Sequence, residues 1–204
     1  MPDDAPRLYL VTPREGDVAA ILPGLEAALG LGLVACLRLD LATRDDDDWT
    51  RAVNLLMPIC HAADVPLVIT DRVEMVEPLG LDGVHLAANH ASVKKLRKSL
   101  GKDRIIGAAG GTTRHRAMTL AEAGADYVTL GPLSADGAPS EGRADDALFR
   151  WWAEMIETPA VAEGGVDLAT ARRLADAADF LVPDPDTVWS APASSLPAFA
   201  EAIR

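Results

Sequence analysis

Charged side chains stand at the ends of short apolar runs in this chain. The run Leu67–Thr70 is followed directly by Asp71, and the run Leu33–Asp40 carries Arg38 and Asp40 at its end. Short apolar runs of this kind are typical of strands buried in a parallel sheet. An acid or a base at the end of such a strand indicates that this edge of the sheet carries the functional site.

A later apolar run ends in Glu163, which is followed by Gly164 and Gly165. Adjacent glycines between a strand and a helix let backbone N–H groups approach a phosphate. Glu163 is therefore a candidate catalytic carboxylate beside a phosphate-binding element. The alternative is a structural ion pair of Glu163 with Arg38 or Arg143.

Three further side chains suit a divalent metal ion. Asp40, Asp71 and His90 are expected at the ends of neighbouring strands, and two carboxylates with an imidazole are ligands that several divalent ions accept. The alternative for Asp71 is an ion pair with Arg72 or Arg38, or a cap on the helix that follows.

Eight apolar runs must position these side chains, and helical segments alternate with them. A repeat of about 25 residues over the 204-residue chain is near the lower size limit of a (β/α)₈ barrel. A doubly wound open sheet is the competing fold, but regular alternation favours closure. We therefore predict one domain, residues 1–204, folded as a (β/α)₈ TIM barrel. The expected strands are Leu8–Thr12, Leu33–Asp40, Leu67–Thr70, Gly83–Leu86, Arg104–Ala109, Asp126–Gly131, Thr158–Glu163 and Ala178–Val182.

Composition narrows the classes of partner. The net charge of −12 and a pI near 4.6 disfavour nucleic acid and anionic membrane surfaces as partners. No apolar run approaches the ~18 residues of a membrane span, and the acidic start lacks a basic signal region, so a cytoplasmic protein is expected. Cys36 and Cys60 are expected to be reduced core thiols, and His85 a hydrogen-bonded core residue.

Several segments together carry a family resemblance that extends from Leu8 to about Val182. In order and spacing the chain resembles thiamine phosphate synthase and its thiazole tautomerase relatives. The resemblance implies a TIM barrel and a transferase of thiamine biosynthesis that uses Mg²⁺. Such an enzyme joins an aminopyrimidine diphosphate to a thiazole phosphate and expels pyrophosphate, so it implies a small phosphorylated heterocyclic ligand. The segments are LYLVTP, CLRLD, PLVITDRVEMVEPLGLDGVHL, RIIGAAGGTT, AGADYVTLGPL and TPAVAEGGV.

Some of the family's site residues carry over by position. Its Gln-Leu-Arg-x-Lys motif reads Cys36-Leu37-Arg38-Leu39-Asp40, so the arginine is kept and the lysine is replaced by an acid. Its Asn-Asp pair reads Thr70-Asp71, which keeps one Mg²⁺ carboxylate. Its second metal acid falls near His90.

The phosphate-binding positions carry over less completely. The Gly-Gly element is present as Gly164 and Gly165, and Gly131 stands where the preceding phosphate loop begins. The family's serine after the fifth strand reads Ala109, and its lysine in the loop after Gly131 has no counterpart. The loop after the eighth strand reads Val182-Pro183-Asp184-Pro185.

Three interpretations remain open at this point. The chain is an enzyme of thiamine metabolism with a reduced synthase site, a paralogue acting on another small phosphorylated or heterocyclic ligand, or a non-catalytic barrel. The tautomerase alternative expects a histidine base where Gly110 and Gly111 stand, and His115 is expected to face solvent. The oligomeric state is open between a monomer and a homodimer.

Overall fold

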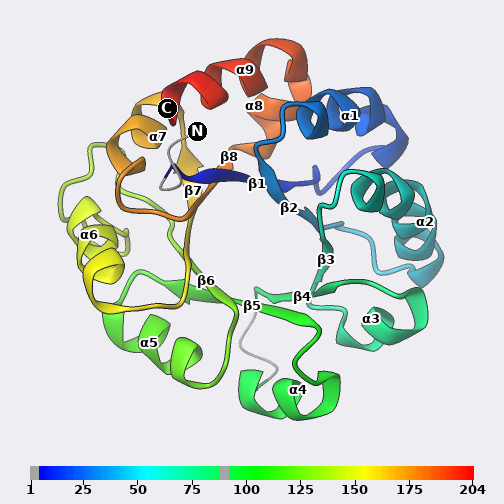
Figure 1. The fold of residues 1–204 in the computed structure, drawn as a ribbon, viewed down its shortest axis with the longest axis horizontal. Helices are drawn as coiled ribbons and strands as arrows, with labels where there is room; N and C mark the ends of the chain where they lie inside the picture. Colours follow the sequence, from blue (N-terminus) through cyan, green and yellow to red (C-terminus); the bar gives the residue numbers. More distant parts are fainter. Residues whose placement is uncertain (1–4, 88–91) are drawn as a thin grey trace.

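A closed barrel of eight parallel strands forms the centre of the molecule (Figure 1). The computed structural model describes residues 5–87 and 92–204. Each strand pairs with the next along the chain, and β1 pairs with β8 to close the barrel. The predicted fold is therefore confirmed and the open sheet is excluded. The strands are β1 Arg7–Val11, β2 Val34–Leu39, β3 Leu67–Thr70, β4 Gly83–Leu86, β5 Ile105–Gly111, β6 Tyr127–Leu130, β7 Ala160–Val166 and β8 Phe180–Pro183.

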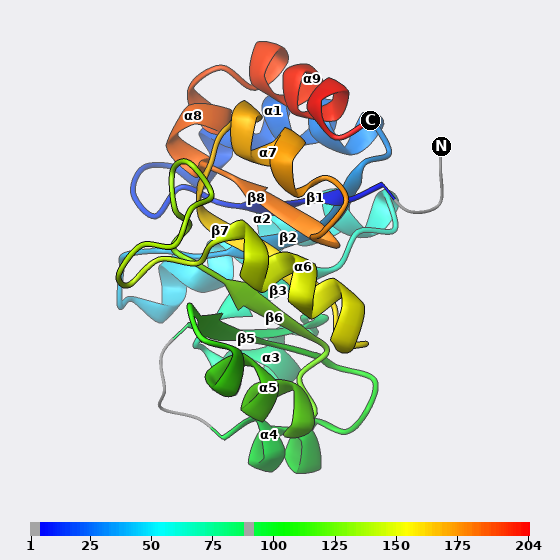
Figure 2. The same ribbon diagram turned by 90° about the vertical axis from the view of Figure 1, so that its left-hand side faces the viewer.

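Helices surround the barrel on the outside, as Figure 1 shows. Figure 2 gives the side view, in which α8 and the long loop between β6 and α6 lie at the left, at the carboxyl ends of the strands. The helices are η1 Val18–Ile21, α1 Leu22–Gly30, α2 Asp46–Ala62, α3 Val73–Leu79, α4 Val93–Leu100, α5 Arg114–Glu122, α6 Asp146–Met155, α7 Leu168–Leu174, α8 Pro185–Ser190 and α9 Pro192–Ala202.

Aspartates begin several of these helices. The side chain of Asp45 accepts a hydrogen bond from the N–H of Asp47 at the start of α2, and Asp167 does the same for Thr170 at the start of α7. A capping carboxylate satisfies an otherwise free N–H group and interacts favourably with the helix dipole. The acidic residues 45–48 therefore serve to start α2.

Alternation along the strands creates two cores. One lies between the sheet and the helices; the other fills the barrel interior. Because side chains alternate between the two faces of a strand, the inward positions of β2 are Cys36 and Arg38, and those of β3 are Val68 and Thr70. Cys36 and Cys60 are both free and buried, which confirms the prediction of reduced core thiols.

The structure differs from the predicted elements in three places. A helix, α8, begins directly after β8 in the segment that was expected to be a loop. The side chain of Asp184 caps it by accepting from the N–H of Thr187 at 3.0 Å. Strands β5 and β7 continue into the glycine pairs that were expected to follow them. In the part of the chain that the structure describes, no helix is long and apolar enough to cross a membrane.

Candidate active site

A cavity opens at the carboxyl ends of the strands, where the sequence predicts the site. It has a volume of about 420 Å³, and we call it the Asp40 cavity. Arg38, Asp40, Glu163 and the two glycines after Glu163 all line it, so the fold brings these predicted residues together. The remaining lining residues are Val11, Thr12, Pro13, Arg14, Glu15, Val182, Asp184, Pro185 and Asp186.

Arg38 and Glu163 form an ion pair across the mouth of the barrel. Both terminal nitrogens of the Arg38 guanidinium donate to the Glu163 carboxylate, one of them at 3.2 Å. The Arg38 side chain is only 5% exposed and that of Glu163 is 28% exposed. Burial alone would raise the pKa of Glu163, but the adjacent guanidinium lowers it to about 2. The alternative of an ion pair with Arg38 is therefore confirmed, and Glu163 is a carboxylate with a fixed position.

Two buried polar atoms beside this ion pair have no hydrogen-bond partner in the described parts of the chain. They are Nε of Arg38 and the hydroxyl oxygen Oγ1 of Thr70. Both side chains point into the barrel from neighbouring strands, since Arg38 pairs in register with Val68. A buried polar group without a partner is costly, and in a native protein water or a ligand usually supplies the missing bond. At the mouth of the barrel, Nε of Arg38 and Oγ1 of Thr70 are therefore available to bind water or a polar ligand.

Asp40 and Asp71 lie at the ends of neighbouring strands. Asp40 is 3.6 Å from the exposed Arg14 side chain. Burial raises the pKa of Asp40, and the negative charges of Glu163 and Asp71 add to the rise, while Arg14 opposes it. Asp71 adopts a left-handed backbone with φ of 56°, and its Oδ1 accepts the N–H of Ala87 at 2.9 Å.

The metal prediction stays a prediction. His90, the third expected ligand, lies outside the described residues. Within residues 5–87 and 92–204 there is no group of three or more His, Cys, Asp or Glu side chains that could hold a metal ion. Arg72, an expected partner for Asp71, instead contacts Asp46 at 2.8 Å.

The predicted phosphate-binding glycines lie at the same rim. Gly164 and Gly165 have φ angles of 85° and 102°, which residues other than glycine rarely adopt. Gly131 has φ of 153°, and a Cβ there would lie 1.8 Å from the carbonyl oxygen of Glu163. Glycine is therefore required at Gly131 by close packing of β6 against β7. Phosphate binding by these residues stays a prediction.

A second cavity lies on the opposite side of Glu163. It has a volume of about 290 Å³, and we call it the His85 cavity. Burial lowers the pKa of His85 to about 3, with a further contribution from the Arg38 charge, so its imidazole is neutral. His85 is 1% exposed and hydrogen-bonded to Tyr127, as predicted for a core residue. The cavity is lined by His85, Ala87, Ala109, Gly111, Arg116, Thr129, Gly131, Pro132, Glu163 and Gly164.

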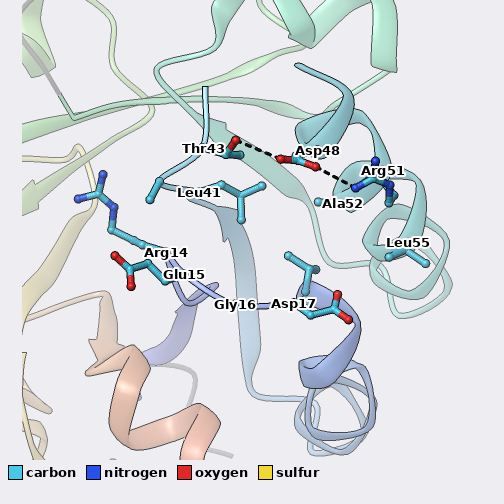
Figure 3. Close-up of a pocket in the computed structure, with 12 residues that line it drawn as sticks. Arg14, Glu15, Gly16, Asp17, Leu41, Thr43, Asp48, Arg51, Ala52 and Leu55 are labelled. Atoms are coloured by element: carbon cyan, nitrogen blue, oxygen red, sulfur yellow. Dashed lines mark hydrogen bonds and ion pairs between the residues drawn. The ribbon is translucent and has the colours of Figure 1, made fainter. Parts of the chain in front are cut away.

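A groove adjoins the Asp40 cavity between the loop after β1 and helix α2 (Figure 3). We call this space of about 510 Å³ the Arg51 groove. Dashed lines in Figure 3 join Thr43 to Asp48 and Asp48 to Arg51, while Arg14 extends away from Arg51. Arg14 lines both the groove and the Asp40 cavity, so its flexible cation borders the predicted site.

Sequence reasoning missed Arg14, Arg116, Tyr9 and Tyr127. The two tyrosines carried a usable signal, because polar-tipped aromatic side chains inside otherwise apolar strands need buried hydrogen-bond partners. Arg14 and Arg116 carried none, because Arg14 lies in the loop after β1 and Arg116 lies in α5, in segments with no distinctive spacing. Arg116 donates from Nε to the carbonyl oxygen of Ala109 at 3.1 Å.

Comparisons with known proteins identify the family to which the sequence is similar. The sequence profile of a family described as thiamine monophosphate synthase matches residues 8–180. The thiamine-phosphate synthase of Rhodospirillum centenum is 40% identical over 200 residues, which cover 97% of this chain and 96% of that protein. The thiamine-phosphate synthase of Erythrobacter litoralis is 36% identical over 205 residues, which cover 97% of this chain and 95% of that protein.

Solved structures share the fold. The thiamine phosphate pyrophosphorylase of Pyrococcus furiosus superposes with a TM-score of 0.75 at 21% sequence identity, and the match covers 97% of each chain. At this level of identity the likeness extends to the architecture of the barrel alone.

Proposed function

The chain belongs to the thiamine monophosphate synthase family of thiamine biosynthesis, and on this premise we propose that it joins an aminopyrimidine diphosphate to a thiazole phosphate. The observation that carries the proposal is the Asp40 cavity, at whose wall Arg38, Asp40 and the Gly164–Gly165 pair meet. This is the rim at which enzymes of this fold carry their active sites.

The leaving diphosphate sets the main chemical demand on the site. As its C–O bond breaks, negative charge grows on the pyrophosphate, and fixed donors or cations must stabilise that charge. Arg14 brings an exposed cation to the rim, and Nε of Arg38 offers a buried donor that has no partner among the described residues. Because Glu163 holds the other two nitrogens of Arg38, the direction of this donor is set before a ligand arrives.

Two carboxylates at the rim have the donor chemistry that a magnesium ion prefers. Mg²⁺ prefers carboxylate oxygens and retains several waters, and Asp40 and Asp71 present carboxylates from neighbouring strands. We propose that these two side chains, with His90 as a third, hold the ion. When bound, the ion would supply positive charge to the diphosphate.

The thiazole phosphate is assigned to the glycine-rich side of the mouth. Gly164 lies between the two cavities and lines both of them. Left-handed glycines expose backbone N–H groups that can bind phosphate oxygens without a cation. This support matters here because Asp184 stands at the neighbouring strand end and would repel an anion.

A second candidate function is binding of another ligand without catalysis. Five carboxylates but only two arginines line the Asp40 cavity, and both arginines are already ion-paired, Arg38 with Glu163 and Arg14 with Asp40. This excess of negative charge in the cavity favours a less anionic ligand unless a divalent cation is present.

Growth rescue of a bacterial strain that lacks thiamine phosphate synthase tests the proposed function. Rescue by the wild-type chain supports the synthase. The second candidate predicts no rescue at equal protein level, together with a thermal shift on addition of the thiazole phosphate or thiamine phosphate. An Asp71→Asn variant is the matched control, because it removes one metal-binding charge and keeps the size of the side chain.

A further inference from the structure

Three residues on neighbouring strands meet at one level of the barrel interior. In register, His85 of β4 pairs with Gly107 of β5, and Gly107 pairs with Tyr127 of β6. A Cβ on Gly107 would lie 2.0 Å from Cζ of Tyr127, so the missing side chain makes room for the two rings to meet. The rings stack with an interplanar angle of 10°, and the Tyr127 hydroxyl lies 3.1 Å from Nδ1 of His85.

The hydrogen-bond chain continues to a second tyrosine. The hydroxyls of Tyr9 and Tyr127 are 2.6 Å apart, and both residues are buried in the barrel interior. Burying two phenols and an imidazole costs free energy that an apolar filling would avoid. The network therefore does more than occupy volume.

The number of hydrogens available gives the direction of the hydrogen bonds that link Tyr9, Tyr127 and His85. Each neutral phenol has one hydrogen to donate, and a neutral imidazole has one donor and one acceptor nitrogen. If Tyr9 donates to Tyr127 and Tyr127 donates to Nδ1, both hydrogens reach strong acceptors. In the opposite direction, the Tyr9 hydrogen is left without an acceptor among the described residues, since the hydrogen-bond partner of the Tyr9 hydroxyl there is Tyr127. The first arrangement is favoured, and it places the ring hydrogen of His85 on Nε2.

Nε2 is the ring nitrogen that remains for the His85 cavity. Among the residues that the structure describes, no side chain or backbone group hydrogen-bonds to it, and His85 lines the cavity. The Glu163 carboxylate lines the same cavity, and its negative charge favours a hydrogen on that side of the ring.

We propose that Tyr9 and Tyr127 hold His85 as the Nε2–H tautomer, which donates a hydrogen bond to an acceptor atom of a neutral heterocycle bound in the His85 cavity. Tyr127 is then a positioning residue that acts through His85. This inference rests on the proposed function and deepens it by assigning a recognition group for one of the two rings.

The residues that line the His85 cavity favour a flat, neutral ligand. Ala87, Ala109 and Gly131 contribute no long side chain to part of its wall, in a volume of about 290 Å³. The two charged side chains of its lining, Glu163 and Arg116, have opposite signs, so together they leave no net charge to attract a phosphate. A ring nitrogen or another uncharged acceptor suits a single N–H donor.

Nitrogen NMR of protein labelled with ¹⁵N-histidine tests the tautomer without any substrate. The His85 signals are assigned by their loss in His85→Gln. We expect a protonated Nε2 and a hydrogen-bonded, unprotonated Nδ1. In Tyr127→Phe the Nδ1 signal should move to the position of an acceptor without a hydrogen bond. The matched control Tyr9→Phe also loses one buried hydroxyl but should keep the Nδ1 signal near its wild-type position.

Two results would overturn this part of the proposal. One is a hydrogen on Nδ1 in the wild-type protein. The other is an equal response of Nδ1 to Tyr127→Phe and Tyr9→Phe, which would indicate a general change in packing.

Ligand binding is tested with the uncharged aminopyrimidine alcohol and thiazole alcohol as probes. One of the two should shift the Nε2 signal. Gln carries an N–H₂ group near the position of Nε2, whereas Asn carries one near Nδ1. His85→Gln should therefore keep affinity for that probe within about threefold, and His85→Asn should weaken it about tenfold. If neither alcohol shifts Nε2, or if both variants bind alike, the ligand assignment is wrong.

The two proposals fail separately. Formation of thiamine phosphate without any Nε2 response overturns the inference and leaves the synthase function in place. Absence of product, with the tautomer and the probe response as expected, overturns the synthase function instead.

Discussion

The guanidinium of Arg38 and the carboxylate of Glu163 join β2 to β7 across the mouth of the barrel with two hydrogen bonds. Glu163 lines both cavities, whereas Arg38 lines the Asp40 cavity. The ion pair thus forms part of the wall between the Asp40 cavity and the His85 cavity.

Removal of Glu163 should destabilise the fold. Glu163→Ala leaves the Arg38 charge buried without its partner, and we expect a loss of about 3 kcal/mol in the free energy of unfolding. Glu163→Gln keeps a hydrogen-bond acceptor and should lose less. Urea denaturation measures both. An Ala variant as stable as the wild-type protein would show that the ion pair contributes nothing to the fold.

Acid should weaken the same interaction. The pKa of Glu163 lies below its ordinary value, so the unfolded chain takes up a proton before the folded protein does. The contribution of Glu163 to stability is complete above pH 4.5 and should be lost as the pH falls toward about 2. Urea titrations across this range should show a smaller pH dependence in Glu163→Gln than in the wild-type protein. Equal slopes for the two proteins would contradict the lowered pKa.

The barrel could be predicted from the sequence because buried parallel strands are short apolar runs. The bounds of β3 and β4 match the predicted runs Leu67–Thr70 and Gly83–Leu86. Helix α8 was missed because the prolines at positions 183 and 185 favoured a loop, although a proline is well tolerated in the first turn of a helix.

The site was predicted less completely, for a physical reason. Strand ends are visible in a sequence, so Arg38, Asp40 and Glu163 were found together. Partners across the barrel depend on which face of each strand points inward, and continuous apolar runs hide that alternation. The pairing of Tyr9 with Tyr127 therefore appeared only in the structure.

Arg14 should matter for the substrate and not for the fold. Its side chain is 69% exposed, so Arg14→Ala should change stability by less than about 0.5 kcal/mol. Loss of a cation beside the diphosphate should raise the KM for the aminopyrimidine diphosphate about tenfold. Arg51→Ala is the matched control, because Arg51 is 68% exposed and lines the neighbouring Arg51 groove but not the Asp40 cavity. Similar KM values for the two variants would remove Arg14 from the site.

Gly131 should tolerate no side chain. In Gly131→Ala the new Cβ meets the backbone of β7, and we expect a loss of at least about 3 kcal/mol in the free energy of unfolding. Gly142→Ala is the control: Gly142 also has a positive φ, of 66°, but no atom lies within 4 Å of its Cβ position, so only about 1 kcal/mol of backbone strain is expected. Equal losses in thermal or urea unfolding would show that the contact with β7 is not limiting.

Product formation by the purified protein tests the central claim most directly. The wild-type chain is incubated with the aminopyrimidine diphosphate, the thiazole phosphate and Mg²⁺, and thiamine phosphate and pyrophosphate are quantified together. The account predicts equal amounts of the two products, loss of both on chelation of the metal, and a rate at least about tenfold lower for Asp71→Asn. Absence of thiamine phosphate from a folded wild-type protein that binds the thiazole phosphate would contradict it.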